Sequence, residues 1–552
     1  MSVKDLIRKH ALANALAHNG KANPGAIIGK LISEDDKLKS KIKELQPDIQ
    51  KIVKEVNALK PAEQEAELRK IFPEFFEKKE AVSKDLPELP NAVQGKVVTR
   101  LAPEPNGHLH IGHGIAFFFN HYYAKRYNGK CVLRFEDTNP QAEKKEFYES
   151  IAEDLDWLGI EYAERKNNSD DVELFYKHGE ALLEKGELYV CQCPVELMRE
   201  NRGKGKECEC RKNTPEQNIE LWKKMLKDLP EGIAVVRLKG DLKAKNSVMR
   251  DPTMFRVILG DHPFQGTKYR VWPLYDFANA IEDAVCGVTH VIRSHEFDQR
   301  NELQNHIRDL LGLKNPEIIS YTRIQVEASP TSKRFLKPMV ESGEVMGWDD
   351  PRLATIKGLK RRGIIPETVH ELGLEVRMTR GSTTIDWKAI CGVNKKLLEE
   401  KSDHYYFVPE PVKVEVKDAP EKTAELALHP SLGKGTRKIK AKNIFYIPKE
   451  DAKKGKMRLK GLYNINYLGN GKAEYAGEEL VQSMPKIQWV TDDNVELELL
   501  IPDVLTAKDS LQTVKGLGEF AVGKLKAGDI VQFERVGFCR KDSDKVFIRA
   551  HK

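Results

Sequence analysis

The chain has 552 residues, of which 40% are hydrophobic, and its 91 Lys and Arg against 84 Asp and Glu give a net charge of +7. This length predicts several domains with ordinary cores, and the small charge excess permits a polyanionic partner without requiring one. No apolar run is long enough to span a membrane and the N-terminus lacks a secretory signal, so we expect a cytoplasmic protein that does not bind membranes.

The first residues predict a separate helical segment. Ser2 and Asp5 have the spacing of a capping box, and apolar stripes then predict three helices, around residues 6–16, 27–32 and 45–56. Prolines and a glycine between residues 87 and 95 predict a linker. The segment is either a charged helical appendage or a docking site for RNA or a partner protein.

A turn at residues 103–113, with the sequence Pro-Glu-Pro-Asn-Gly-His-Leu-His-Ile-Gly-His, separates a predicted strand at residues 97–101 from a predicted helix that ends at Asn128-Gly129. A second strand follows at residues 131–135. Strand, helix and strand predict a βαβ unit with parallel strands and a right-handed crossover. Ligands of such sheets bind beyond the carboxyl ends of the strands, where this turn lies.

The residue types of the turn suit a phosphate group. Gly107 and Gly112 allow a ligand to approach the backbone, and the first amides of the helix can donate to an anion. His110 and His113 can donate to phosphate oxygens, most usefully as charge builds on a phosphorus atom during in-line displacement. The alternative is that these histidines, with His108, cap the helix or bind a metal.

The second strand ends in a polar segment, Arg134-Phe135-Glu136-Asp137-Thr138-Asn139-Pro140. A carboxylate at this edge can bind the ammonium group of a substrate, and Glu136 is the better candidate. We also expect Asp137 or Asn139 to cap the next helix.

Eight cysteines occur in the chain, and four of them form the pattern C-x-C-x14-C-x-C: Cys191, Cys193, Cys208 and Cys210. Clustered cysteines indicate a metal site in a reducing compartment better than a disulfide framework. Four thiolates suit tetrahedral Zn²⁺ and leave no open coordination position, so the site is predicted to be structural. The alternative is four reduced cysteines that are close by accident. A basic loop with Arg202, Lys204 and Lys206 lies between the pairs.

The sheet is predicted to resume beyond an insertion. Residues 272–279 lead into a helix on which Tyr275 and Asn279 share a face, and residues 288–293 form a buried strand. Arg293 ends that strand and would be costly to bury without an anion, which suggests a bound carboxylate. The alternative is an ion pair with one of three nearby carboxylates, Glu282, Asp283 or Glu296.

The last third of the chain changes character. A basic loop is predicted at residues 329–334, Ser-Pro-Thr-Ser-Lys-Arg, and a basic helix at residues 356–363 follows the segment Gly347-Trp348-Asp349-Asp350-Pro351-Arg352. From about residue 404, alternating apolar and polar residues with Gly and Asp turns predict an antiparallel sandwich or barrels.

These motifs together resemble the class I aminoacyl-tRNA synthetases, and specifically the archaeal-type glutamyl-tRNA synthetases, which are built like the glutaminyl enzymes. Residues 110–113 form a HIGH motif preceded by the Pro-Glu-Pro-Asn-Gly of this branch, and residues 347–352 and 531–535 are also characteristic. The second class signature, KMSKS, is replaced by Pro330-Thr331-Ser332-Lys333-Arg334, which keeps the second lysine but lacks the first lysine and the methionine.

The resemblance implies a multidomain α/β and all-β protein, with a class I Rossmann-like catalytic domain split by an acceptor-binding insertion, an N-terminal helical region and C-terminal antiparallel β-barrels. The expected boundaries are 1–95 for the N-terminal helical domain, 96–170 for the first half of the catalytic fold, 171–270 for the acceptor-stem-binding insertion with four-cysteine zinc knuckles, 271–338 for the second half with the KMSKS-like loop, 339–403 for a helical connecting subdomain, and 404–552 for the anticodon-binding barrels.

The resemblance also implies a reaction. The α-carboxylate of L-glutamate attacks the α-phosphorus of ATP, bound with Mg²⁺, to give glutamyl-adenylate and pyrophosphate. The terminal adenosine of tRNA(Glu) then accepts the glutamyl group on its 2′-hydroxyl. Enzymes of this kind usually need bound tRNA before they activate glutamate. We expect a monomer, and leave open whether tRNA(Gln) is also charged with glutamate.

By family position, the site residues divide into four sets. The catalytic residues are His110, His113 and Lys333. The ATP-binding residues are Glu104, Asn106, Gly112, His295, Arg323, Ile324, Ser332 and Lys333. The amino-acid-binding residues are Arg100, Glu136, Tyr275, Asn279 and Arg293. The zinc ligands are Cys191, Cys193, Cys208 and Cys210.

Three other functions remain as alternatives. A glutaminyl-tRNA synthetase shares nearly every motif, but that family carries a small neutral residue where this chain has Arg293, whose unpaired charge would penalise a neutral amide. A small nucleotidyltransferase would lack the C-terminal barrels, and a non-catalytic RNA-binding protein would not need His110, His113 and Lys333.

Overall fold

The computed structural model describes residues 3–17, 20–34, 42–75, 85–381, 383–507 and 509–552. The chain divides into two compact units, Met1–Asp85 and Leu86–Lys552. Each unit is described by itself.

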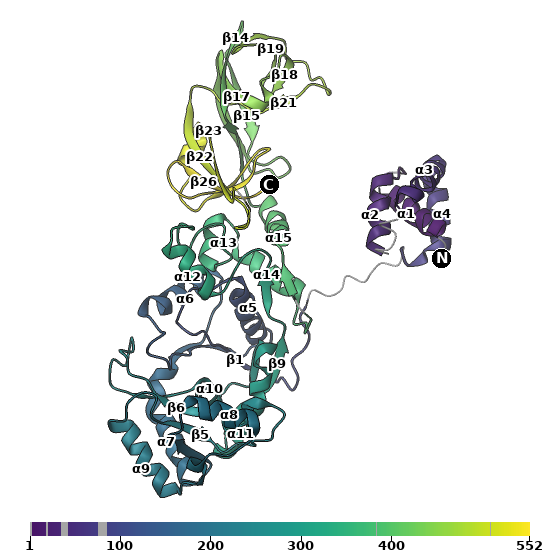
Figure 1. Cartoon of the computed structure of the whole chain (residues 1–552). Helices are drawn as coiled ribbons and strands as arrows, with labels where there is room; N and C mark the ends of the chain where they lie inside the picture. The colour runs from purple at the N-terminus through teal and green to yellow at the C-terminus, as the bar shows by residue number, and fades with distance from the viewer. Residues whose placement is uncertain (1–2, 18–19, 35–41, 76–84, 382, 508) are drawn as a thin grey trace. The chain divides into compact units, whose positions relative to one another are not determined.

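The first unit is a bundle of helices (Figure 1), with the bounds α1 (Val3–Ala17), α2 (Pro24–Glu34), α3 (Ile42–Ala58) and α4 (Pro61–Ile71). Ile7, Leu12, Ile27 and Leu68 are fully buried in its core. Helix α4 is not predicted from the sequence, because charged residues hide its apolar face. Its start is well specified, since Pro61 follows Lys60, whose amide donates to the Glu63 carboxylate. The predicted capping box includes Ser2, which lies outside the described residues.

The second unit contains the predicted parallel sheet. Strands β1 (Val98–Leu101), β2 (Lys130–Phe135) and β3 (Glu164–Asn167) pair in parallel, and α5 (Ile111–Arg126) connects the first two, which confirms the βαβ unit. Strands β8 (His290–Ser294) and β9 (Glu317–Tyr321) also pair in parallel. The Val98 amide donates to the Thr289 hydroxyl, and the Thr289 amide donates to the Val98 carbonyl.

Strand β8 therefore lies on the free side of β1, and the spatial order is β3-β2-β1-β8-β9. The order in which strands are added therefore reverses at β1, because β2 and β3 lie on one side of it and β8 and β9 lie on the other. Open α/β sheets bind ligands at such a reversal, beyond the carboxyl ends of the strands. Helix α5 covers this region and is itself covered, because α14 (Pro366–Val376) packs across it with Gly373 against the Phe118 ring.

One capping prediction is wrong. Helix α6 (Lys145–Trp157) begins well beyond Asp137 and Asn139, and neither caps it. The buried Asp137 carboxylate instead accepts hydrogen bonds from the Tyr148 and Ser169 hydroxyl groups. A side chain within α6 and a hydroxyl from a later segment thus satisfy the carboxylate that was predicted to cap the start of this helix.

The insertion between β3 and β8 has its own sheet. Strands β4 (Leu188–Cys191), β5 (Val235–Leu238), β6 (Thr253–Val257) and β7 (Val271–Pro273) form an antiparallel sheet in that order. Its helices are α7 (Val172–Glu184), α8 (Val195–Lys204) and α9 (Pro215–Lys227). Helix α8 lies where we predicted a basic loop, and most of its residues are exposed.

Helices then frame the resumed sheet, with the bounds α10 (Tyr275–Val285), α11 (Asp298–Leu311), α12 (Lys333–Glu341), α13 (Ile356–Arg362) and α15 (Trp387–Glu399). The short strands β10 (Ile324–Val326) and β11 (Thr383–Ile385) pair in parallel. The basic loop that we predicted to extend through Arg334 ends earlier, because Ser332 is the N-cap of α12 and Lys333 its first residue.

The remaining strands form two nearly closed sheets. The first has the order β12 (His404–Tyr405), β24 (Ile530–Phe533), β25 (Gly537–Lys541), β26 (Val546–His551), β22 (Asn494–Pro502), β23 (Leu511–Glu519) and β13 (Phe407–Pro409). Its two edge strands, β12 and β13, are consecutive pieces of one segment, so the sheet curls back on itself.

The second sheet has the order β17 (Ile444–Pro448), β14 (Pro411–Lys417), β20 (Lys472–Tyr475), β19 (Asn464–Gly469), β18 (Gly455–Leu459) and β21 (Lys486–Ile487). A bridge between Tyr446 and Val490 joins its two ends. Strands β15 (Lys422–Ala427) and β16 (Thr436–Ala441) form a ribbon beside it. Most pairs are antiparallel as predicted, but four are parallel because strands far apart in the sequence meet there.

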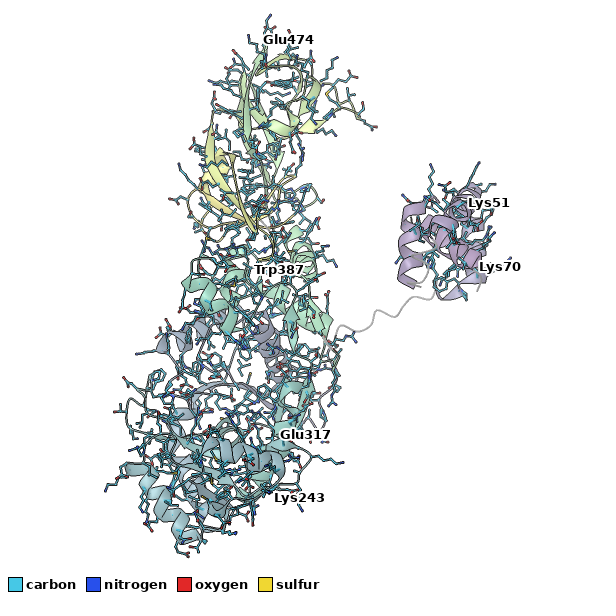
Figure 2. All side chains as sticks on the ribbon, viewed as in Figure 1. Lys51, Lys70, Lys243, Glu317, Trp387 and Glu474 are labelled. Atoms are coloured by element: carbon cyan, nitrogen blue, oxygen red, sulfur yellow. The ribbon has the colours of Figure 1, made fainter. Side chains whose placement is uncertain are left out.

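One arginine connects the first barrel sheet to the helices. Trp387, labelled in Figure 2, lies at the start of α15, and the guanidinium of Arg362 stands 4.4 Å from the centroid of its ring. The same guanidinium donates to the carbonyls of Pro351, Pro502 and Ala550.

In the part of the chain that the structure describes, no helix is long and apolar enough to cross a membrane.

Candidate active site

Three adjoining cavities lie beyond the carboxyl ends of β1, β2 and β8. The central cavity has a volume of about 390 Å³, the turn cavity about 250 Å³ and the insertion cavity about 280 Å³. Glu104 lines all three, His110 and His113 line the first two, and Glu136 and Tyr275 line the first and third. The three spaces therefore form one continuous site.

The predicted site residues gather here. The central cavity is lined by Arg100, Glu104, His110, Gly112, His113, Glu136, Tyr275, Arg293, Arg323 and Ile324. The turn cavity is lined by Glu104, Asn106, His110, His113, Arg323, Ser332 and Lys333. Asn279 lines the insertion cavity with Arg256 and Arg300. His295 does not line these three cavities, and its Nδ1 lies 3.3 Å from the carbonyl oxygen of Tyr321.

The two histidines of the turn are held by the backbone. His110 is the N-cap of α5, and its Nδ1 accepts a hydrogen bond from the Gly112 amide at 3.1 Å. His113 Nδ1 accepts from the His110 amide at 3.3 Å, and the two rings stack with their centroids 3.8 Å apart. His110 therefore caps helix α5, as the alternative interpretation predicted, and it also lines the cavity.

The surroundings of both imidazoles favour the neutral form. Burial, together with the charges of His113 and Arg323, lowers the pKa of His110 well below its ordinary value. Burial and the charge of Arg323 lower the pKa of His113 to about 4. Because each Nδ1 accepts from an amide, each neutral ring carries its proton on Nε2. The pair therefore offers two N–H donors whose tautomers are set by the backbone.

Gly112 is required by close packing. A Cβ atom on this residue would lie 2.9 Å from Cε1 of His110 and 3.1 Å from the carbonyl oxygen of Ile324. Any side chain here would push β10 away from the turn or displace the His110 ring. The glycine thus lets the two histidines and β10 share one wall of the central cavity.

The lysine at the start of α12 lies over the turn. Lys333 Nζ donates to the Asn106 carbonyl and lies 5.2 Å from the centroid of the Phe147 ring, a cation–π distance. Its Cδ lies beside Gly107. Burial and the charges of Lys144 and Lys337 lower the pKa of Lys333. The loop that leads into α12 is therefore already folded onto the turn.

A buried charged cluster lies behind Arg100, which lines the central cavity. The Asp283 carboxylate is contacted by three guanidinium groups, those of Arg134 at 2.8 Å, Arg308 at 3.1 Å and Arg100 at 3.4 Å. Burial alone would raise the pKa of Asp283, but the three arginines lower it to about 2. This carboxylate stays ionised and fixes Arg100 at the edge of the cavity.

Arg134 orients two of the predicted ligand-binding side chains. It is fully buried, and its Nη2 donates to the Asn279 side-chain oxygen at 2.6 Å and lies 3.5 Å from the Glu136 carboxylate. Because the amide oxygen of Asn279 faces Arg134, its Nδ2 has no hydrogen-bond partner among the described residues. Burial raises the pKa of Glu136, and Arg134 and Arg100 oppose that shift.

Sequence reasoning did not single out Arg134 or Asp283 for the site. One signal was present, since a buried strand of a parallel sheet is usually apolar throughout and Arg134 interrupts it. The other was the four-residue spacing of Tyr275, Asn279 and Asp283, which places them on one face of α10. We considered Asp283 only as an alternative partner of Arg293.

The side chain of Arg293 makes no ion pair. Only 6% of the residue is exposed, and its guanidinium donates to the Tyr275 hydroxyl, the Asn301 amide oxygen and the Gln304 amide oxygen. Within the described ranges, no carboxylate lies within 4.0 Å of it, so the ion pair that we considered with Glu282, Asp283 or Glu296 is not formed. Glu296 instead pairs with Arg323.

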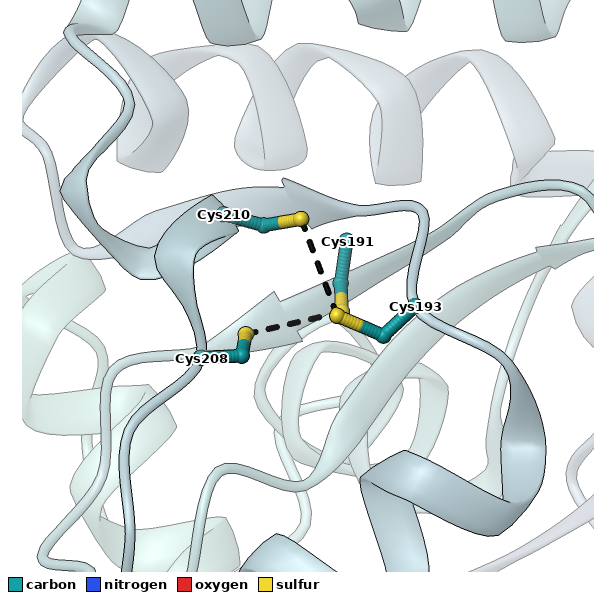
Figure 3. Close-up of side chains that lie close together, drawn as sticks. All are labelled: Cys191, Cys193, Cys208 and Cys210. Carbon is teal, nitrogen blue, oxygen red and sulfur yellow. Dashed lines mark hydrogen bonds between the residues drawn. The ribbon is translucent and has the colours of Figure 1, made fainter.

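The four cysteines of the insertion converge, as Figure 3 shows. Their Sγ atoms all lie within 4.8 Å of one another, with Cys191 and Cys208 at 3.8 Å and Cys193 and Cys210 at 3.8 Å. A tetrahedral metal with Zn–S bonds of about 2.3 Å separates its sulfur ligands by about 3.8 Å. The thiol positions therefore fit such a site.

Polar contacts hold both cysteine pairs from outside. The Asp251 carboxylate accepts hydrogen bonds from the Tyr189 hydroxyl before the first pair and from Arg211 after the second. Arg237 Nη1 lies 3.8 Å from the Cys191 sulfur, where it can offset thiolate charge.

The chain matches three family models. Residues 96–400 match the catalytic domain of the class I tRNA synthetases for glutamate and glutamine, and residues 402–479 and 486–542 match two anticodon-binding domains of the same synthetases. The chain is 43% identical to a glutamate–tRNA ligase of Pyrococcus abyssi, with 100% of each chain covered. It is 40% identical to one of Nitrosopumilus maritimus, with 100% of this chain and 99% of that one covered.

A solved glutamate tRNA ligase from Elizabethkingia meningosepticum, crystallised with its amino acid, is 20% identical, with a TM-score of 0.42 over 56% of this chain and 70% of that one.

Proposed function

Because the chain belongs to the class I tRNA synthetases for glutamate and glutamine, we propose that it is a glutamate–tRNA ligase. The observation that carries the choice of glutamate is Arg293, a buried guanidinium without a carboxylate partner on the wall of the central cavity. A buried cation of this kind is costly unless a ligand supplies the anion. The γ-carboxylate of glutamate is that anion, whereas the amide of glutamine is not.

In the first step, the α-carboxylate of glutamate attacks the α-phosphorus of ATP and pyrophosphate leaves. The Nε2–H groups of His110 and His113 and the ammonium of Lys333 donate to phosphate oxygens as charge develops on them. Since these groups are held in place before reaction, they stabilise the transition state without reorganisation. Mg²⁺ bound to the triphosphate would offset its charge. No group of the protein needs to form a covalent bond.

The amino acid lies in the central cavity with its two ends recognised separately. Glu136 accepts from the ammonium group, Tyr275 and Arg293 bind the γ-carboxylate, and Arg100 lines the same cavity, while Asn279 lines the adjoining insertion cavity. The remaining assigned residues that line the cavities, Glu104, Asn106, Gly112, Arg323, Ile324 and Ser332, would bind ATP, whereas His295 lies outside them.

In the second step, the terminal adenosine of the tRNA accepts the glutamyl group. The insertion cavity joins the central cavity at Glu136 and Tyr275, and its walls carry Arg256 and Arg300, of which Arg300 pairs with Asp276. The insertion would hold the acceptor end and the barrels the anticodon, through backbone contacts and stacked bases. We further propose that the chain works as a monomer in the cytoplasm.

Pyrophosphate exchange tests this function. With L-glutamate and ATP, exchange is expected only after tRNA(Glu) is added, because enzymes of this architecture complete their site on the tRNA. Exchange without tRNA, with a substrate other than an amino acid, would indicate a small nucleotidyltransferase. No exchange under any condition would indicate a binding protein.

Charging of purified transcripts decides tRNA and amino-acid specificity. We expect tRNA(Glu) to accept glutamate and neither transcript to accept glutamine. Glutamate on tRNA(Gln) would identify a non-discriminating enzyme, which we include in the proposal. Glutamine on tRNA(Gln) would identify the glutaminyl alternative and overturn the assignment.

We propose that Cys191, Cys193, Cys208 and Cys210 hold one structural Zn²⁺. Replacing Cys208 with serine is expected to abolish zinc binding and to lower the melting temperature of the insertion by roughly 10 °C, since closed sites with four cysteine ligands contribute directly to folding. Metal analysis and calorimetry measure both effects. Cys391, which lies outside the cluster and donates to the Ala550 carbonyl, provides the control variant C391S, which should retain one zinc per chain. Wild-type protein purified without zinc would contradict the proposal.

A further inference from the structure

The guanidinium of Arg293 is held from behind by two neutral amides. Its Nη2 donates to Asn301 Oδ1 at 2.5 Å and to Gln304 Oε1 at 2.9 Å, both from α11. Its Nη1 reaches only the Tyr275 hydroxyl, at 3.4 Å, and its Nε has no partner in the described structure. A guanidinium has five N–H donors. The amides therefore fix its position while several donors stay available on the other side.

The orientation of one amide is set by its neighbours. Gln304 is fully buried, and its Nε2 donates to Asp276 Oδ1 at 3.1 Å while its Oε1 accepts from Arg293. Asp276 is itself paired with Arg300. Burial raises the pKa of Asp276, and Arg300 and Gln304 oppose that shift. Gln304 thus stands between Asp276 and Arg293, so that this carboxylate orients the amide without pairing with the guanidinium.

A neutral acceptor and a carboxylate beside Arg293 differ in how much of its positive charge remains to attract a ligand. A carboxylate at either position would form a buried ion pair with Arg293, and a substrate carboxylate would then have to compete with it. An amide oxygen supplies the hydrogen bond but leaves the positive charge uncompensated. The gain from binding an anion in the cavity is correspondingly larger, and so is the penalty for a neutral amide.

We infer that Asn301 and Gln304 are specificity-determining positioning residues, which hold Arg293 by neutral contacts so that its charge selects a substrate carboxylate. This inference rests on the proposed function, because it deepens the choice of glutamate over glutamine. Neither residue lines the central cavity, and both act through Arg293.

The test is the isosteric substitution Asn301→Asp, which places a carboxylate at the same hydrogen-bond distance from Arg293. In tRNA-dependent pyrophosphate exchange, we expect the KM for glutamate to rise at least about tenfold while the KM for ATP stays within about twofold. The ratio of kcat/KM for glutamate to that for glutamine should fall by a similar factor. A general structural defect would change the ATP constant and the melting temperature as well.

The matched control is Asn305→Asp, one turn further along α11. Asn305 Oδ1 accepts from Arg308, which is already paired with Asp283 and does not line the central cavity. This variant makes the same chemical change and adds the same charge to the same helix, and the glutamate-to-glutamine ratio should stay at its wild-type value.

A second variant separates charge from geometry. Asn301→Ser keeps a neutral acceptor and is expected to preserve the preference for glutamate, even if both substrates bind more weakly. An unchanged ratio in N301D, or an equal loss of preference in N301S, would overturn the inference while wild-type glutamate exchange leaves the proposed function standing. Failure of the wild-type enzyme to activate glutamate would instead refute the proposed function.

Discussion

Replacing Lys333 with methionine is expected to slow ATP–pyrophosphate exchange by about 100- to 1,000-fold, the usual effect of removing one preorganised donor to a developing charge. Methionine keeps most of the apolar stem beside Gly107 and the Phe147 ring, so the loop should still fold onto the turn. The loss should therefore fall on kcat for the activation step and leave the KM for glutamate nearly unchanged.

Lys337 provides the control for this experiment. It lies one turn further along α12 and pairs with Glu341, with 56% of its side chain exposed. Lys337→Met should leave the exchange rate within about twofold of the wild-type rate. If Lys333→Met also exchanged at the wild-type rate, Lys333 would not act on the phosphates of ATP. Since the KMSKS-like segment already lacks the first lysine and the methionine, none of its three characteristic residues would then contribute to activation.

Replacing Arg293 with cysteine is expected to weaken glutamate activation by at least about tenfold, measured as kcat/KM in tRNA-dependent exchange, because the γ-carboxylate would lose the buried guanidinium that we propose binds it. The same substitution removes the penalty on a neutral amide, so activation of glutamine should rise relative to that of glutamate. The KM for ATP should change little, because the turn cavity lies on the other side of the two histidines.

Arg293→Lys is the second variant at this position and tests whether charge alone is sufficient. Lysine keeps the charge but cannot donate to Tyr275, Asn301 and Gln304 together, so we expect an intermediate loss with the preference for glutamate retained. An unchanged kcat/KM for glutamate in the cysteine variant would remove the assignment of glutamate, whatever the other motifs indicate.

Local sequence was sufficient where one segment determines its own structure. The turn at residues 103–113 lies between a strand and a helix, as its prolines and glycines predicted. Helix α10 begins at Tyr275, so Tyr275 and Asn279 share one face as predicted. The four cysteines were predicted to converge because metal-ligand spacing is itself a local pattern.

Local sequence was insufficient where charged side chains from distant segments contact one another. Asp283 lies on α10, but its three arginines come from β1, β2 and α11, and their contacts depend on the folding of the sheet. The same reason explains the wrong cap, since Asp137 accepts from the Tyr148 side chain within the next helix and from Ser169, and not from the amides at the start of that helix. Asn301 and Gln304 are ordinary polar residues of an exposed-looking helix until Arg293 is placed beside them.

The joint between the helices and the first barrel has a consequence for how the molecule can diversify. Arg362 donates there to three main-chain carbonyls, of Pro351, Pro502 and Ala550, and not to any side chain. Every residue has a carbonyl, so these three hydrogen bonds do not depend on which side chains the barrel carries, whereas the contacts of Arg361 with Asp542 and of Arg352 with Ser510 do. Substitutions on the barrel surface away from Asp542 and Ser510 therefore leave the attachment to the helices in place.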